Sequence, residues 1–178
     1  RLFLFFQFIA VNSFRCGSDS IRKKPHKIKD DTIDNKRRRL KNEYTPLKMF
    51  VDYTYLTSQN LLNSKKLNDL KNIFSEVTKS IGYLLSVVHL RVQIDKDAIS
   101  DYCEIPKVSA NIVSSLDAND ILIFPMINSN LDDNVLAQAW TCITLASNQR
   151  PVAGVVEINP DFSLDTEDSA YYMKYLLL

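Results

Sequence analysis

Residues 150–178 read RPVAGVVEINPDFSLDTEDSAYYMKYLLL, and this stretch decides the assignment of the fold. Its first half has the composition of a strand. Pro151 opens a run rich in β-branched residues, and the pair Asn159-Pro160 closes it. We therefore predict a strand that begins near Arg150 and ends at the Asn-Pro pair.

The second half of the stretch begins like a helix that has not ended by Leu178. Asp165 or Thr166 can cap its first turn, and Glu167 places negative charge beside the exposed N–H groups. No glycine, proline or basic residue marks an end in residues 176–178. We interpret the chain as a fragment that stops inside a helix.

The strand and the helix entry resemble the leishmanolysin family of secreted zinc metallopeptidases, which carry an Arg-Pro-x-x-Gly strand ending in Asn-Pro before the catalytic helix. The matching residues here are Arg150, Pro151, Gly154, Asn159 and Pro160. In that family the helix continues into His-Glu-x-x-His, in which the histidines bind zinc and the glutamate is the general base. The resemblance implies that the catalytic residues come just after Leu178 and that none lies in this chain.

Length and composition allow one globular domain with a substantial core, because 46% of the 178 residues are hydrophobic. The net charge of +1 hides an asymmetry. Residues 15–41 contain 11 of the 22 Lys and Arg and 4 acidic residues, whereas residues 42–178 contain 10 basic and 17 acidic residues. A basic arm can bind nucleic acid or anionic lipid. Docking onto the acidic body of the same chain is an equally good interpretation, since no aromatic residue interrupts the basic run.

Residues 1–13, RLFLFFQFIAVNS, have the features of a secretory signal peptide without its initiating methionine. A basic residue precedes an apolar run that is too short to span a bilayer, and Val11 and Ser13 suit signal-peptidase cleavage. A buried strand of a cytosolic protein is the alternative. We predict entry into the secretory pathway and an extracellular or cell-surface location, which argues against a nucleic-acid partner.

Residues 14–41 are then a basic pro-region, expected to be largely disordered because this polar sequence offers little apolar surface to bury. Within it, FRCGSDSI resembles the pro-region motif of the family, in which a cysteine coordinates the active-site zinc and blocks it. Cys16 is thus a candidate inhibitory zinc ligand. Ser18 stands where many members have histidine, and an unrelated thiol is the alternative. The run over residues 36–39 indicates a linker or a processing site.

The folded body is expected over residues 42–178. Strand-like alternation over residues 45–56 predicts a first strand, and apolar residues at helical spacing over residues 67–84 predict a long amphipathic helix. Alternation over residues 88–94 predicts a second strand, and strand, helix, strand in this order implies a right-handed crossover with parallel pairing.

Residues 95–120 are expected to be irregular. After them, ILIFP over residues 121–125 predicts a central parallel strand that is buried on both faces. His89 and His26 have no cysteine, histidine or acid at ligand spacing, so we predict that neither binds a metal.

The resemblance also implies details of the body. It implies that the strand after Arg150 is an antiparallel edge strand, to which an extended substrate could add as a further strand. It implies a disulfide between Cys103 and Cys142. The implied fold is α/β: the N-terminal subdomain of a metzincin-type catalytic domain, with a twisted, mostly parallel sheet of four to five strands, one long crossover helix and the start of the active-site helix.

Together these features predict the pro-region and upper catalytic subdomain of a secreted zinc-dependent endopeptidase that is inactive as this fragment. Zinc and a peptide or protein substrate belong to the full-length parent, as do the family's cell adhesion and membrane association through a missing C-terminal region. The alternative is a secreted, non-enzymatic interaction protein on a degenerate metallopeptidase scaffold. The sequence that follows Leu178 distinguishes the two.

Overall fold

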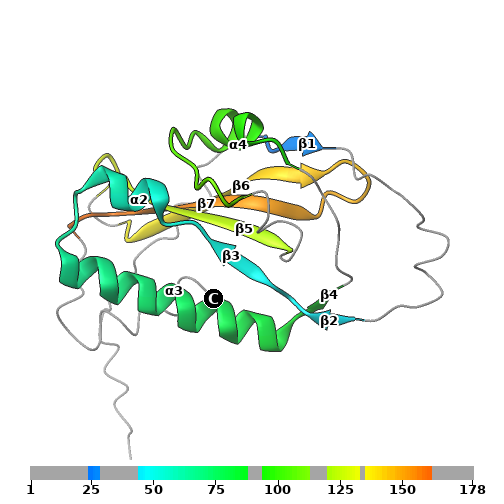
Figure 1. The fold of residues 1–178 in the computed structure, drawn as a ribbon, viewed down its shortest axis with the longest axis horizontal. Coiled ribbons are helices and arrows are strands. Elements are labelled where there is room, and N and C mark those ends of the chain that lie inside the picture. Colours follow the sequence, from blue (N-terminus) through cyan, green and yellow to red (C-terminus); the bar gives the residue numbers. More distant parts are fainter. Residues whose placement is uncertain (1–23, 29–43, 88–93, 113–119, 133–134, 162–178) are drawn as a thin grey trace, which may run out of the picture.

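The structure, a computed structural model, describes residues 24–28, 44–87, 94–112, 120–132 and 135–161. A five-stranded sheet with the order β1-β6-β7-β5-β3 runs through its centre (Figure 1). Its strands are β1 (His26–Ile28), β3 (Met49–Val51), β5 (Ile121–Ile127), β6 (Ala137–Leu145) and β7 (Pro151–Ile158). All neighbours pair in parallel except β6 and β7, which are antiparallel. The chain is therefore α/β with a mostly parallel sheet, as predicted.

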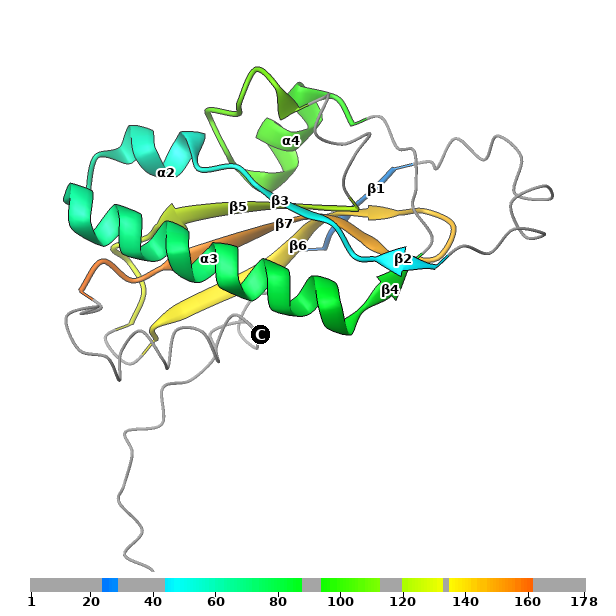
Figure 2. The same cartoon turned by 60° about the horizontal axis from the view of Figure 1, so that its bottom comes forward.

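Helices lie on both faces of this sheet. They are α2 (Thr54–Gln59), α3 (Ser64–Leu84) and α4 (Lys96–Cys103). Figures 1 and 2 show α3 and α4 on opposite sides of the sheet. Each side has its own core: Phe74 of α3 belongs to one apolar cluster, and Ile99 of α4 belongs to the other. The sheet is thus covered from both sides, which explains why its central strands β5 and β7 read as nearly continuous apolar runs.

The long helix predicted over residues 67–84 is confirmed as α3. Asn63 caps its first turn, because its side chain accepts a hydrogen bond of 2.8 Å from the Lys66 amide. The predicted face is buried at its centre, but Leu84, the last residue of the helix, is 78% exposed. The buried residues on this face are Leu70, Ile73, Phe74 and Val77.

The single strand predicted over residues 45–56 is wrong in its second half. The chain forms the two-residue strand β2 (Thr45–Pro46), then β3, and then turns into α2. Asp52 causes the change, because its carboxylate accepts a hydrogen bond of 2.9 Å from the Thr54 amide and so favours a turn. This side-chain contact stops the alternating pattern from continuing as a strand.

The chain after α3 does not return directly to the large sheet. Its next element is β4 (Ser86–Val87), which pairs antiparallel with β2 in a separate two-stranded sheet. The predicted strand over residues 88–94 lies outside the described residues except for Ile94. The parallel neighbour of β3 is instead β5, which confirms the predicted central parallel strand.

Pro125 is tolerated in the middle of β5 because its missing N–H faces the side where β3 has already ended. The Ile123 carbonyl oxygen, on that same side, accepts from the Asp52 amide at 2.9 Å. Two residues beyond the proline, the Gln59 side chain of α2 takes the place of a strand. Its amide group donates to the Ile127 carbonyl oxygen and its oxygen accepts from the Ile127 amide, both at 2.8 Å. The helix therefore completes the hydrogen bonding of the strand.

The expectation of irregular chain over residues 95–120 is wrong for residues 96–103, which form α4. Asp95 starts this helix by accepting a hydrogen bond from the Asp97 amide at 3.2 Å. Ile99 and Cys103 lie one turn apart and are both buried. A helix of 8 residues gives too short a pattern for its period to be recognised beside the turn residues that follow.

Candidate functional site

The candidate site is the outer edge of β6, the side of that strand that faces away from β7. The prediction that the strand after Arg150 is an antiparallel edge strand is wrong. That strand is β7, and it lies between β5, to which it is parallel, and β6, to which it is antiparallel. The antiparallel strand that approaches the edge of the sheet is therefore β6.

Part of this outer edge is paired with β1, which comes from the basic arm. His26 lies opposite Ile143 and Ile28 lies opposite Leu145 in a parallel register. The Ala146 amide donates to the Ile28 carbonyl oxygen at 2.7 Å. The arm is expected to be largely disordered; these three of its residues form a strand, and Ile28 also packs against the core on the α4 side.

His26 contacts a ring rather than a metal ligand. Its imidazole stacks on Tyr102 of α4, with ring centroids 3.6 Å apart and an angle of 8° between the planes. Within the described segments, no group of three or more His, Cys, Asp or Glu side chains could hold a metal ion. Because a stable zinc site takes three or four protein ligands, the described residues do not fit zinc.

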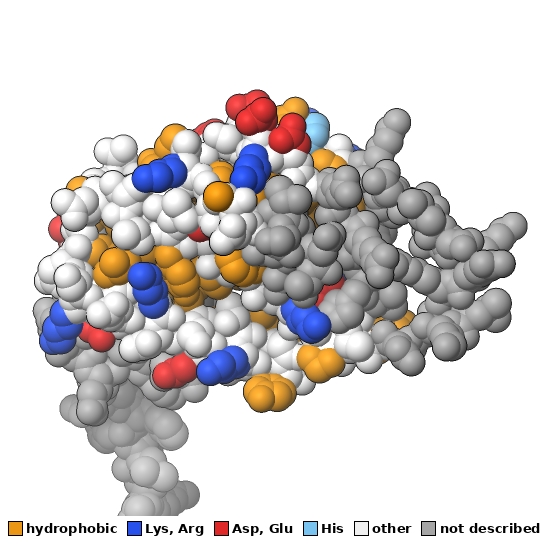
Figure 3. All heavy atoms as spheres, in the orientation of Figure 1, with side chains coloured by type: hydrophobic (Ala, Val, Ile, Leu, Met, Phe, Trp, Pro, Cys, Tyr) orange, Lys and Arg blue, Asp and Glu red, His pale blue; other side chains and the backbone are white. Residues whose placement is uncertain are grey.

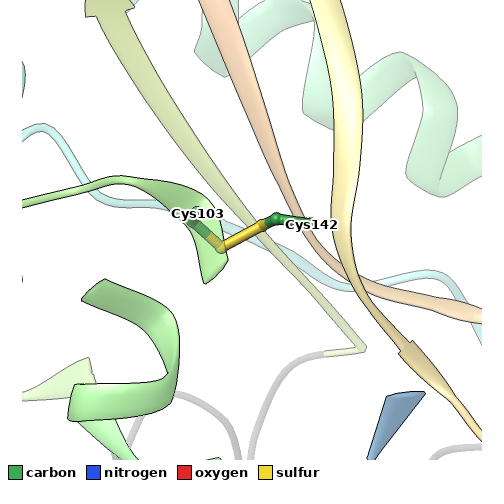
Figure 4. Close-up of a disulfide and its surroundings, with 2 residues drawn as sticks. All are labelled: Cys103 and Cys142. Atoms are coloured by element: carbon green, nitrogen blue, oxygen red, sulfur yellow. A yellow bond between two sulfur atoms is a disulfide. The ribbon is translucent and has the colours of Figure 1, made fainter. Parts of the chain in front are cut away.

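Cys103 and Cys142 form a disulfide with an S–S distance of 2.02 Å, which is the pairing implied by the resemblance. Figure 4 shows the bond reaching from the end of α4 to β6. Both residues are buried, with exposed fractions of 0% and 3%. The bond closes a loop across 39 positions of sequence. It joins α4, which covers one face of the sheet, to β6.

The other residues singled out from sequence lie outside the described part of the chain. These are Cys16, the candidate inhibitory ligand, and His89. The signal peptide over residues 1–13 and the helix expected from Thr166 to Leu178 also lie outside it.

The residues of the Arg-Pro-x-x-Gly and Asn-Pro pattern have structural contacts. The Arg150 guanidinium pairs with Asp120 at 3.1 Å, and the other oxygen of that carboxylate accepts from the Lys48 amide at 3.0 Å. Asn159 is 7% exposed, and its side-chain amide donates to the Val135 carbonyl oxygen at 3.1 Å. These contacts attach both ends of β7 to neighbouring segments of the same chain.

A buried carboxylate in β7 was not predicted. Glu157 of β7 is 8% exposed, and its carboxylate accepts hydrogen bonds from the side-chain amides of Asn128 and Gln138. Gln138 lies directly opposite Glu157 in the β6–β7 register, so both side chains share one face. The signal in the sequence is a single charged residue inside the apolar run VVEIN. These hydrogen bonds join β7 to β6 and to the residue that follows β5, at one end of the sheet.

An open pocket of about 510 Å³ lies where β3 passes into α2. Its polar lining residues include Thr54, Thr57, Ser58, Lys107 and Asp52. Asp52 is 4% exposed and already accepts from the amides of Thr54 and Ser109, at 2.9 and 2.8 Å. This carboxylate therefore holds two chain segments together, and the pocket offers binding groups without a nucleophile paired to a base.

None of the helices in the described segments is long and apolar enough to cross a membrane. No protein-family model matches the chain, and no curated protein matches it either. The candidate site therefore rests on the geometry of the β6 edge and of the residues around it.

Proposed function

We propose that this chain is the pro-region and upper catalytic subdomain of a secreted zinc-dependent endopeptidase that resembles the leishmanolysin family. The observation that carries the proposal is the arrangement at β6. In an otherwise parallel sheet, β6 lies beside β7 and is antiparallel to it, and a strand from the basic arm pairs with the outer edge of β6. Such an edge accepts an extended peptide as a further strand, which is the form of substrate that an endopeptidase cleaves.

The arm strand supports the pro-region part of the proposal. β1 occupies part of the edge that a substrate strand would use, so arm and substrate exclude each other there. Cys16 precedes β1 in the same arm and stays the candidate inhibitory ligand. The arm therefore combines a covering strand with a thiol, as a pro-region of this kind requires.

The disulfide supports the predicted secretory location, because such bonds form and persist in oxidising compartments. Zinc ligands are assigned to the His-Glu-x-x-His helix expected after Leu178, and no step of peptide hydrolysis is assigned to a residue of this chain. The family's cell adhesion and membrane association belong, in this proposal, to regions beyond the chain.

The deciding experiment starts with the transcript beyond the codon for Leu178. We expect an open frame that reads His-Glu-x-x-His within the first turns after that residue. The protein expressed through the complete domain should contain one zinc and cleave casein, and a chelator should abolish the cleavage. A matched variant with the motif glutamate changed to glutamine should keep its zinc and lose the activity.

A continuous frame without the motif would contradict the proposal. It would instead favour the non-enzymatic interaction protein, in which the β6 edge binds a peptide without cutting it. Binding of an extended peptide to the β6 edge, measured by chemical-shift changes at residues 137–145, is expected in both cases. Zinc content and cleavage therefore decide between the two functions.

A further inference from the structure

Two different elements hold the arm strand β1. On one side, β6 pairs with it over residues 143–145, and the Ala146 amide donates to the Ile28 carbonyl oxygen at 2.7 Å. On the other side, the Tyr102 ring of α4 stacks on His26 with centroids 3.6 Å apart. Because β1 has 3 residues, its backbone bonds alone give little stability, and the ring contact becomes a large part of what retains it.

The disulfide joins the two elements that hold β1. Cys103 follows Tyr102 directly in the sequence, and Cys142 directly precedes Ile143, which lies opposite His26. The Cα atoms of the two cysteines are 5.0 Å apart. The bond therefore sets the distance between the stacking ring and the strand edge that bind the same arm residues.

The charges on α4 also favour binding of the arm. The exposed acidic side chains of Asp97, Asp101 and Glu104 lie on α4 and at its end, whereas Lys24 and Lys27 of the arm are basic and exposed. Figure 3 shows acidic side chains gathered beside the described histidine on this face. Opposite charges draw the arm towards α4, and salt weakens that attraction.

We propose that Tyr102 and the Cys103–Cys142 disulfide form a seat for the arm strand, and that the arm leaves and rejoins this seat while the rest of the sheet stays folded. β1 is the outermost strand of the sheet on that side, Lys27 is exposed, and Ile28 is only partly buried. Elements with so few buried contacts open at a lower free energy than the central strands. While the arm is away, the edge over residues 143–145 is open to another extended segment.

This proposal goes beyond the proposed function. It concerns contacts between residues of this chain, so it holds or fails whether or not the parent protein is a peptidase. It assigns Tyr102 and the disulfide a positioning role towards the arm and no role in chemistry.

The test uses hydrogen exchange of the whole 178-residue chain, read at the Ala146 amide, which reports directly on the bond to Ile28. Loss of the ring in Tyr102→Ala should speed exchange at Ala146 by about two- to twelvefold. Amides at the centres of β5 and β7 should keep their rates. The matched control is Tyr83→Ala, which removes a tyrosine that is 87% exposed on α3 and should leave Ala146 unchanged.

A second variant, with Cys103→Ser and Cys142→Ser together, should speed exchange at Ala146 more than Tyr102→Ala does. Trypsin should also cut this variant after Lys27 at a lower trypsin concentration than the parent chain requires. If the double variant does not fold, Tyr102→Ala alone decides. An unchanged rate at Ala146 in Tyr102→Ala overturns the proposal, and so does an equal acceleration at every strand, which would mean that the ring acts on global stability and not on the seat.

Discussion

Gly154 lies where the backbones of β6 and β7 come very close. A Cβ atom at this position would lie 3.1 Å from the Trp140 carbonyl oxygen. That oxygen belongs to the backbone of a paired strand, so it moves less easily than the end of a flexible side chain would. A side chain at this position of the Arg-Pro-x-x-Gly pattern would therefore make the Trp140 backbone shift by a few tenths of an ångström.

We expect Gly154→Ala to lower the free energy of unfolding by about 1–3 kcal/mol, because the new methyl group must push the two strands apart. Urea unfolding followed by far-UV circular dichroism measures the change. Alanine is otherwise the better residue in a strand, by about 0.5–1 kcal/mol. A variant as stable as the parent, or more stable, would show that the strands give way easily.

The hydroxyl of Tyr53 makes the free energy of unfolding depend on pH in the alkaline range. Burial raises the pKa of its hydroxyl from 10.0 to about 12. Below pH 10 the hydroxyl is protonated in both the folded and the unfolded chain. Between pH 10 and pH 12 the unfolded chain loses this proton and the folded chain keeps it, so stability falls as the pH rises.

We expect the loss from this residue to reach at most about 1.4 kcal/mol per pH unit in that window. Tyr53→Phe should remove this part of the slope, because phenylalanine has no proton to lose. Tyr44→Phe, at a tyrosine that is 64% exposed, is the control and should keep the slope. Urea unfolding at a series of pH values from 8 to about 12 measures it, and identical slopes in the parent and Tyr53→Phe would refute the assignment.

At the scale of elements, α2 acts as a continuation of the sheet. The Gln59 side chain makes two hydrogen bonds of 2.8 Å with the backbone of Ile127, where β3 no longer reaches. A carboxamide suits this task because it carries both a donor and an acceptor, like a peptide group. The short helix is therefore joined to β5 by polar contacts as well as by its buried Leu56.

We expect Gln59→Ala to cost about 1–3 kcal/mol of unfolding free energy, since it leaves the amide and the carbonyl of Ile127 without this partner. Gln59→Glu keeps the acceptor but places a carboxylate oxygen against the Ile127 carbonyl oxygen, so it should also be less stable than the parent. Ser58→Ala removes an exposed hydroxyl that donates to the Tyr55 carbonyl oxygen and should change stability by less than about 0.5 kcal/mol. Equal effects of Gln59→Ala and Ser58→Ala would contradict the role of Gln59.

The elements predicted correctly share one property. The periodicity of α3 and the apolar run of β5 are long enough to show, from neighbouring residues alone, which side is buried. α4 and the start of α2 are shorter, and single side chains decide them. Asp52 and Asp95 each bind a backbone amide two positions later, a contact that average propensities do not report.

At the scale of the whole molecule, the described residues bring together no group of three or more His, Cys, Asp or Glu side chains that could hold a metal ion. We expect the purified 178-residue chain, washed with EDTA and then given equimolar zinc, to retain no stoichiometric zinc after desalting. The reason is that no described group of three or more ligand side chains converges, and zinc sites need three or four ligands. Elemental analysis checks this, and one retained zinc per chain would contradict it.

The order of the strands in the sheet was not predicted from the sequence. The strand after Arg150 was expected at an edge, whereas β7 lies between β5 and β6. The pairing of the arm with β6 was not expected either. Glu157 was also missed, because its amide partners come from β6 and from the loop after β5. Each of these contacts joins residues that are distant in the sequence.

The sequence by itself determined the α/β class, the long helix α3 and the apolar strands β5 and β7, because the alternation or repetition of apolar residues reports local burial. Only the tertiary structure decided the order of the strands, the docking of β1 beside Tyr102 and the burial of Glu157. The physical reason is that a strand's pattern shows which of its faces is covered but not which neighbour receives its backbone hydrogen bonds.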